Sequence, residues 1–290
     1  MTPMLVQHHP HPASAPPAAD GPGRARDWAE IQERMLVPLY EAVYQHLEVG
    51  TRTRLLGLGC GSGLALLMAA ARGAQVTGVD TDNARMDLAR ERLLPESGAG
   101  GGHRHGGTKL LYGRPAEAGD ATRPAYNLVT AFQPVGGCGP EEDEEADGLA
   151  AALAAAVPMA ERGSAVVLTG WGPPERCATS AVLRVAGRLT ERLRTATSWR
   201  PALRDDLEEV AGRAGLRPDG SGRVACPFGY ADMGSAVRGL MSTGLFDAAV
   251  AASDQATVEK EVIEALHPHV RADGTVWMAN VFRYLVARTP

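Results

Sequence analysis

The chain has 290 residues, 44% of them hydrophobic, which is enough to bury a full core and exceeds the size of a minimal doubly wound domain. Its formal net charge is −5, but six acids lie between residues 141 and 147 and the rest of the chain is nearly neutral, so no general field attracts nucleic acid. No apolar run reaches the roughly 18 residues of a membrane span, and the four cysteines are too dispersed for a zinc site or a disulfide framework. We expect a soluble, cytoplasmic protein without a bound metal.

The N-terminal region divides into a tail and a helix. Residues 1 to about 24 are rich in Pro, Ala and His, a composition that predicts a disordered tail. From Asp27 to about Leu47, apolar residues recur at helical spacing. That face comprises Trp28, Ile31, Met35, Leu39, Val43 and Leu47. Pro38 predicts a kink or division of this helix, and the folded domain is expected to span residues 25–290.

The most informative segment is 55–63, an apolar run that ends in Gly59, Gly61 and Gly63. A helical pattern follows from Leu64 to Arg72, so the segment predicts a strand, a tight turn and a helix start. Glycine permits positive φ and close approach of a ligand, and the free N–H groups of a helix start favour an electron-rich partner. The next expected strand, 75–79, ends at Asp80, whose carboxylate can accept both hydroxyl hydrogens of a ribose. Loop and acid predict a site for a nucleoside-containing cofactor; alternatively, the glycines only form a tight turn.

The spacing of the glycines narrows the choice of cofactor. A dinucleotide fingerprint requires G-x-G-x-x-G, but Leu64 occupies the sixth position, and no G-x-x-x-x-G-K-[ST] phosphate loop occurs. The G-x-G-x-G form resembles motif I of the class I S-adenosylmethionine (SAM) methyltransferases. Further segments are similar to the later strands and the second helix of that family. They are 76–80, 83–94, 126–132 (motif IV), 165–171 and 280–287. The resemblance implies SAM as cofactor.

The order of the expected elements predicts the fold. Strands are expected at about 54–58, 75–79, 109–113, 126–132, 164–170, 223–228 and 275–287, with helices between them, such as 175–193 and 204–214. This alternation predicts an α/β fold with a doubly wound, mostly parallel seven-stranded sheet. A helical cap is expected at about 232–269, before the last strand. We interpret residues 95–107 as a flexible connection and the acidic run as a solvated loop.

The resemblance also assigns residues to the two parts of a binding site. The implied cofactor contacts are Gly59, Cys60, Gly61, Gly63, Asp80, Thr81, Ala116, Glu117, Ala131 and Phe132. The residues expected to line a substrate pocket are Trp28, Tyr40, Gln133, Trp171 and Tyr230. Aromatic rings there can meet a sulfonium through cation–π contacts, or they can simply belong to the core. No side chain stands out as a general base, so no catalytic residue is assigned.

Three positions depart from the family pattern; the mildest is Gln133, where related chains commonly carry Asn, and the other two concern groups that accept hydrogen bonds from SAM. Members usually carry an acid that holds the methionine amino group two residues before the first glycine, where this chain has Gly57. They usually carry Gly-Asp after the third strand, where the carboxylate accepts the adenine amino hydrogen, and this chain has Gly113-Arg114. Glu117 lies close enough in sequence to substitute for that carboxylate. Losing a hydrogen bond to a charged group costs about 1.5–3 kcal/mol, so both departures bear on SAM affinity.

The resemblance implies transfer of a methyl group from SAM to a small organic molecule by a monomer or homodimer. Two alternatives stay open. One is a degenerate protein of the same fold with a regulatory or partner-binding role, for which Gly57 and Arg114 argue. The other is a SAM-binding enzyme that catalyses rearrangement or cyclisation with the help of the sulfonium charge. SAM affinity separates the degenerate protein from both enzymes, and methyl transfer separates the two enzymes.

Overall fold

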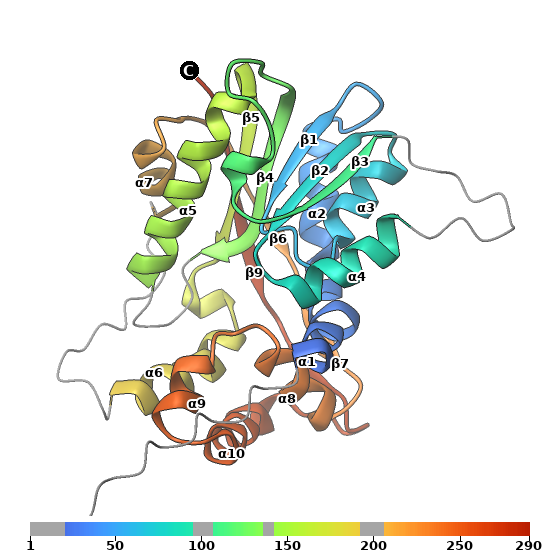
Figure 1. Ribbon diagram of the computed structural model, residues 1–290. Coiled ribbons are helices and arrows are strands. Elements are labelled where there is room, and N and C mark those ends of the chain that lie inside the picture. The colour runs from blue at the N-terminus through green and yellow to red at the C-terminus, as the bar shows by residue number, and fades with distance from the viewer. Residues whose placement is uncertain (1–20, 95–106, 136–141, 192–205) are drawn as a thin grey trace, which may run out of the picture.

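A computed structural model describes residues 21–94, 107–135, 142–191 and 206–290. Its main feature is a seven-stranded sheet with the strand order β3-β2-β1-β4-β5-β9-β6 (Figure 1). The strands are β1 Arg54–Leu58, β2 Gln75–Asp80, β3 Thr108–Tyr112, β4 Tyr126–Val135, β5 Ala160–Trp171, β6 Arg217–Ala225 and β9 Val281–Arg288. Only β9 runs against the others, pairing antiparallel with both β5 and β6. The predicted α/β fold with a mostly parallel seven-stranded sheet is confirmed.

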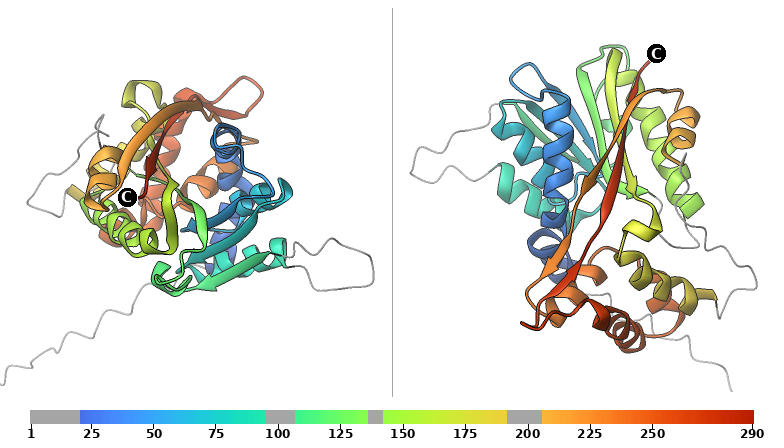
Figure 2. Two further views of the ribbon diagram at one scale, coloured as in Figure 1. Left: turned by 90° about the horizontal axis from the view of Figure 1, so that it is seen from above. Right: turned by 180° about the vertical axis from the view of Figure 1, so that it is seen from behind.

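Helices cover both faces of this sheet (Figure 2). One face carries α2 Val37–His46, α3 Leu64–Ala71 and α4 Asn83–Leu93, and the other carries α5 Glu142–Ala156 and α7 Asp206–Arg213. Successive residues of a strand point to opposite faces, and β1 illustrates the result. Leu55 packs into the core beneath α2 and α3, whereas Leu56 packs into the core beneath α5 and α7. The apolar run of β1 is therefore buried on both sides, as a central parallel strand requires.

The N-terminal segment is more broken than a single kinked helix. Helix α1 spans Gly21–Asp27, a π-helical turn follows at Trp28–Gln32 and a 3₁₀ turn at Glu33–Leu36 before α2 begins. Pro38 lies in the first turn of α2, where its missing N–H costs no helical hydrogen bond. The tail was expected to reach about residue 24, but the helix already begins at Gly21; residues 1–20 lie outside the described part.

A group of helices gathers beyond the carboxyl ends of the parallel strands (Figure 1). It consists of α6 Thr179–Glu191, α8 Met233–Met241, α9 Asp247–Ala252 and α10 Gln255–Leu266. Short 3₁₀ turns occur at Pro115–Glu117, Val157–Met159, Pro174–Arg176 and His267–His269. Helix α10 packs against α6, α8 and α9. The interval predicted as a cap, 232–269, therefore contains three of these helices and shares its packing with α6.

The two last predicted strands are each divided, which corrects the expected 223–228 and 275–287. Strand β6 ends at Ala225 and is followed by β7 Phe228–Tyr230, while β8 Val276–Met278 precedes β9. Strands β7 and β8 form a separate antiparallel pair. The break falls at the buried Asn280, whose side chain accepts a hydrogen bond from the Thr179 N–H and whose carbonyl accepts one from the Cys226 N–H. Beyond this point the chain pairs in the two-stranded sheet instead of the seven-stranded one.

The acidic run is not a loop, contrary to the prediction. Residues 142–147 form the first turns of α5. Asp147 forms an ion pair with Arg213 of α7. The expected flexible connection lies almost wholly in residues 95–106, outside the described residues.

Candidate functional site

The glycine turn after β1 has the conformation that its sequence predicts. Gly59, Gly61 and Gly63 have φ values of +58°, +55° and +81°, a region that other residues rarely adopt. Helix α3 starts at the next residue, Leu64. Space is also tight at Gly61, where a Cβ would lie 3.2 Å from Trp28 Nε1 and 3.5 Å from Glu33 Oε1. The backbone of the glycine turn therefore lies directly beneath the Trp28 and Glu33 side chains of the N-terminal segment.

Asp80 lies beside this turn at the carboxyl end of β2. Its Oδ2 accepts a hydrogen bond of 2.7 Å from the Gly61 N–H, and its Oδ1 accepts one of 2.8 Å from the Asp82 N–H. Asp82 in turn caps α4 by accepting from the Arg85 N–H at 3.0 Å. A carboxylate has about four acceptor positions, so Asp80 retains lone pairs for a ligand while the backbone holds it in place.

Arg85 closes one side of the site. Its Nη2 donates to the Ser242 carbonyl at the end of α8 (2.9 Å), its Nε lies 3.2 Å from an Asp82 oxygen, and its guanidinium stacks 4.3 Å from the Trp28 ring centroid. Burial lowers the pKa of Arg85 and the Asp82 charge raises it. The contact with Ser242 joins the helical region to the glycine turn.

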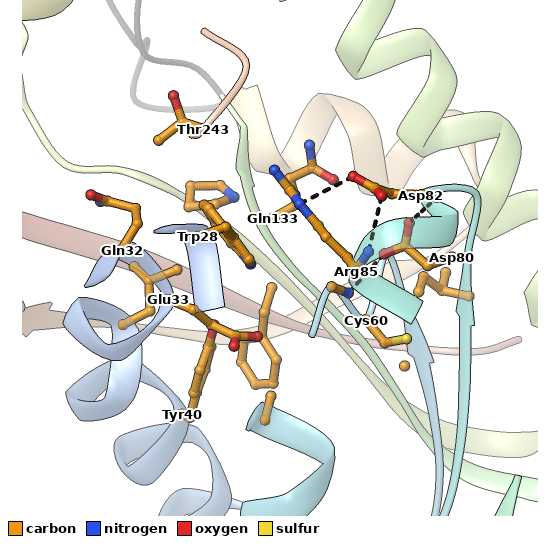
Figure 3. A pocket seen from close by; sticks show the side chains of 18 of the residues that line it. Trp28, Gln32, Glu33, Tyr40, Cys60, Asp80, Asp82, Arg85, Gln133 and Thr243 are labelled. Carbon is orange, nitrogen blue, oxygen red and sulfur yellow. Dashed lines mark hydrogen bonds and ion pairs between the residues drawn. The ribbon is translucent and has the colours of Figure 1, made fainter. Parts of the chain in front are cut away.

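Glu33 is the most buried charge at the site, with only 2% of its surface exposed. One oxygen, Oε2, accepts hydrogen bonds from the Ser62 hydroxyl and from Arg92 Nη1, the latter at 2.8 Å. The other, Oε1, accepts a long bond of 3.4 Å from the Leu64 N–H. Burial raises the pKa of the Glu33 carboxyl, against the effect of the Ser62 and Arg92 hydrogen bonds, which lower it. Figure 3 shows Trp28, Gln32, Glu33 and Tyr40 on one side of the pocket, opposite Asp80, Asp82 and Arg85.

These groups line a central pocket with a volume of about 360 Å³. Its far end is aromatic: the Trp171 ring lies 4.5 Å from the Phe282 ring and 5.9 Å from the Phe228 ring, and the Tyr40 ring lies 4.8 Å from that of Phe132. A side cleft of about 320 Å³ continues past Asp80. It is bordered by Gly113, Pro115 and Ala131, and it shares Asp80, Thr81 and Gln133 with the central pocket. Together they form a cavity at the carboxyl ends of the strands, where ligands bind in this class of sheet.

The structure brings most of the predicted site residues together. The central pocket is lined by Trp28, Tyr40, Gly59, Cys60, Gly61, Asp80, Thr81, Phe132, Gln133 and Trp171. Ala131 borders the side cleft. Gly63 lies behind the turn, packed against α4, and Tyr230 is a buried residue whose hydroxyl donates to Gln32 Oε1 at 2.9 Å. Ala116 and Glu117 are exposed and line neither cavity, although Pro115 next to them does.

Several pocket residues were missed by the sequence prediction. They include Gln32, Glu33, Leu36, Arg85, Thr130, Pro134, Phe228, Thr243 and Phe282. Within the described part of the chain, no three His, Cys, Asp or Glu side chains form a metal-binding group, and Cys60, Cys177 and Cys226 are free thiols. None of the helices that the structure describes has the length and hydropathy needed to cross a membrane.

Comparison with known proteins agrees with this geometry. A family model described as a methyltransferase domain matches residues 56–99, which include the glycine turn and Asp80. No curated protein matches the chain. Among solved structures, a candidate methyltransferase of Bacillus halodurans C-125 has a TM-score of 0.52 at 14% identity, covering 87% of this chain and 98% of that one. The YcgJ protein of Bacillus subtilis has a TM-score of 0.51 at 13% identity, with the same coverage. The chain thus has the class I methyltransferase fold, with the motif I region of a methyltransferase domain.

Proposed function

We propose that this protein is an enzyme that transfers a methyl group from SAM to a small, mainly apolar organic molecule. The observation that carries the proposal is the continuity of one pocket. At one end lies the glycine turn with Asp80, and at the other lies a cluster of buried aromatic rings. A nucleoside-containing cofactor and an apolar acceptor would therefore meet in the same cavity.

The residues of the turn end fit the cofactor. Positive φ at Gly59 and Gly61 allows close approach to the backbone, and Asp80 is held by two backbone N–H groups with acceptor capacity left for ribose hydroxyls. The side cleft beside Asp80, bordered by Gly113 and Ala131, has room for a flat base. When bound, SAM would supply an electrophilic methyl group.

The residues of the aromatic end would hold the acceptor and exclude water. Most of the acceleration of an in-line displacement can come from holding the two reacting atoms close and aligned. No histidine is among the described residues that line the pocket, and burial raises the pKa of Tyr40 well above its ordinary value, so this phenol stays protonated. We therefore expect catalysis by positioning rather than by a general base, with Gln133 and Thr130 as polar contacts to the acceptor.

Calorimetric titration with SAM and S-adenosylhomocysteine is the first test. We expect micromolar binding that Asp80→Ala weakens by at least about 30-fold, the loss of charged hydrogen bonds. Asp87→Ala is the matched control, because its side chain on α4 is exposed and pairs only with Arg90 across the surface. No binding at millimolar ligand would contradict the proposal and favour the degenerate, partner-binding protein.

Transfer of labelled methyl from SAM to a panel of neutral aromatic and aliphatic acceptors is the second test. Label in an acceptor supports the proposal. Conversion of an acceptor without incorporation of label would instead favour rearrangement or cyclisation.

A further inference from the structure

The structure explains why no acid stands two residues before the first glycine. Gly57 lies in β1 and lines the central pocket, but a Cβ built there would approach Leu66 Cδ2 to 2.9 Å. Real Cβ atoms essentially never come so close. The end of the Leu66 side chain in α3 would thus have to shift to make room for a side chain at position 57, and with glycine there an acidic group for the cofactor has to come from elsewhere.

Glu33 brings a carboxylate to the same turn from the N-terminal segment. It lines the central pocket and is 2% exposed, and Oε1 lies 3.5 Å from the position of a Cβ on Gly61. Its orientation is fixed through Oε2, which accepts from Ser62 and Arg92, while Arg92 Nη2 also donates to the Ala29 carbonyl at 3.0 Å. Among the residues that the structure describes, Oε1 accepts a hydrogen bond only from the Leu64 N–H, at 3.4 Å. One carboxylate oxygen is therefore anchored and the other has acceptor capacity above the turn.

The indole N–H of Trp28 faces the same place and has no hydrogen-bond partner among the described residues. Nε1 is fully buried, and it lies 3.2 Å from the position of a Cβ on Gly61. The ring itself is held by the stacked Arg85 guanidinium. A buried donor left unpaired costs free energy. An oriented N–H without a partner at the wall of a pocket therefore points to a ligand acceptor.

We propose that Glu33 and Trp28 together hold the α-amino-acid end of the cofactor over Gly61. Glu33 Oε1 accepts a hydrogen bond from the ammonium group, and Trp28 Nε1 donates one to the carboxylate. The inference rests on the proposed function and deepens it, since it assigns the acceptor missing at Gly57 to a residue outside motif I. A zwitterion suits this pair, because its ammonium group can donate to the Glu33 carboxylate while its own carboxylate accepts from the Trp28 indole N–H.

Two ligands separate this contact from the rest of the site. S-adenosylhomocysteine carries the amino-acid end, and 5′-methylthioadenosine has the same nucleoside and thioether without it. We expect Glu33→Gln to weaken binding of S-adenosylhomocysteine by about 10- to 100-fold and Trp28→Phe, which keeps a ring under Arg85, by several-fold. Binding of 5′-methylthioadenosine should change less than twofold in both. Glu30→Gln is the matched control, an exposed acid of the same segment.

The outcomes are distinguishable. Equal losses for both ligands, or no loss in the two variants, would overturn the inference and leave the proposed function standing. Wild-type protein that binds neither ligand would overturn both. If Glu33→Gln does not fold, Trp28→Phe decides the matter, because Trp28 takes no part in the Arg92 ion pair.

Discussion

The two ends of the central pocket are assembled in different ways. The turn end comes mainly from one stretch of chain, Gly57 to Arg85, in which two strands and two helices follow each other. The aromatic end comes from segments far apart in sequence. It uses Tyr40, Phe132, Trp171, Phe228 and Phe282, from α2, β4, β5, β7 and β9. A local motif builds the part of the site that a whole class of proteins can share, whereas chain topology builds the aromatic end, which we propose holds the acceptor.

Glu33 ties the N-terminal segment to the turn end, and its ion pair with Arg92 should give the largest effect on stability. The Glu33 side chain is 3% exposed and that of Arg92 is 22%. We expect Arg92→Met to lower the free energy of unfolding by about 3–5 kcal/mol, because it leaves a buried carboxylate uncompensated. Urea denaturation measures this.

The neighbouring Arg90 is the matched control for that experiment. It pairs with Asp87 on the exposed surface of the same helix, and Arg90→Met should change stability by less than about 0.5 kcal/mol. Equal effects for the two variants would mean that the turn end does not depend on the N-terminal segment.

Gly57 should tolerate a side chain poorly, because the buried end of Leu66 would have to shift to make room for it. We expect Gly57→Ala to lower the free energy of unfolding by about 1–3 kcal/mol through overpacking against Leu66. Gly212→Ala in α7 is the control, since a Cβ there meets nothing within 4 Å and alanine favours a helix. A stable Gly57→Ala variant would contradict the steric explanation for the missing acid.

The contrast between local and distant segments also explains which site residues could be predicted from the sequence. The glycine turn and Asp80 were predicted because strand, turn, helix and acid succeed one another at short range. Glu33 was missed because helical spacing assigned Trp28 and Ile31 to the buried face and left Glu33 on the solvent side. The π-helical and 3₁₀ turns between Trp28 and Leu36 change that phase and bury Glu33. A nine-residue change in helix type leaves no periodic signal in the sequence.

The strands, too, could be predicted from the sequence only in part. Strands β1 to β5 were predicted to within four residues at each end, because apolar segments such as 55–58 and 165–168 mark them, but β6 begins at Arg217, six residues before the expected start. Phe228 and Phe282 were missed because the chain passes between the two sheets at 226–227 and at Asn280, where the hydrogen bonds join residues that are distant in sequence. The role predicted for Glu117 stays a prediction: Glu117 is exposed, and its carboxylate accepts a 3.4 Å bond from the Arg114 N–H.

Trp171 tests whether the aromatic end acts independently of the turn end. Its ring packs against Phe228 and Phe282, and aromatic pairs contribute about 0.5–1.5 kcal/mol each. Once an acceptor is known, Trp171→Leu should raise its KM by about 2- to 10-fold and leave S-adenosylhomocysteine affinity within twofold. Trp277→Leu is the control, an exposed tryptophan of β8 stacked under Arg271. A change in cofactor affinity would mean that the two ends are coupled.

The smallest expected effect is a pH dependence of stability from Glu33. Burial raises its pKa above the ordinary 4.5, so between 4.5 and the raised value the folded protein binds more protons than the unfolded chain. Stability then falls as pH rises through this window, with a slope below about 1.4 kcal/mol per pH unit. The difference in unfolding free energy between wild type and Glu33→Gln isolates the contribution of Glu33 to this pH dependence, because all other groups titrate in both proteins. A difference that grows with pH would show that Arg92 and Ser62 outweigh burial and that Glu33 is charged throughout, the state best suited to an ammonium group.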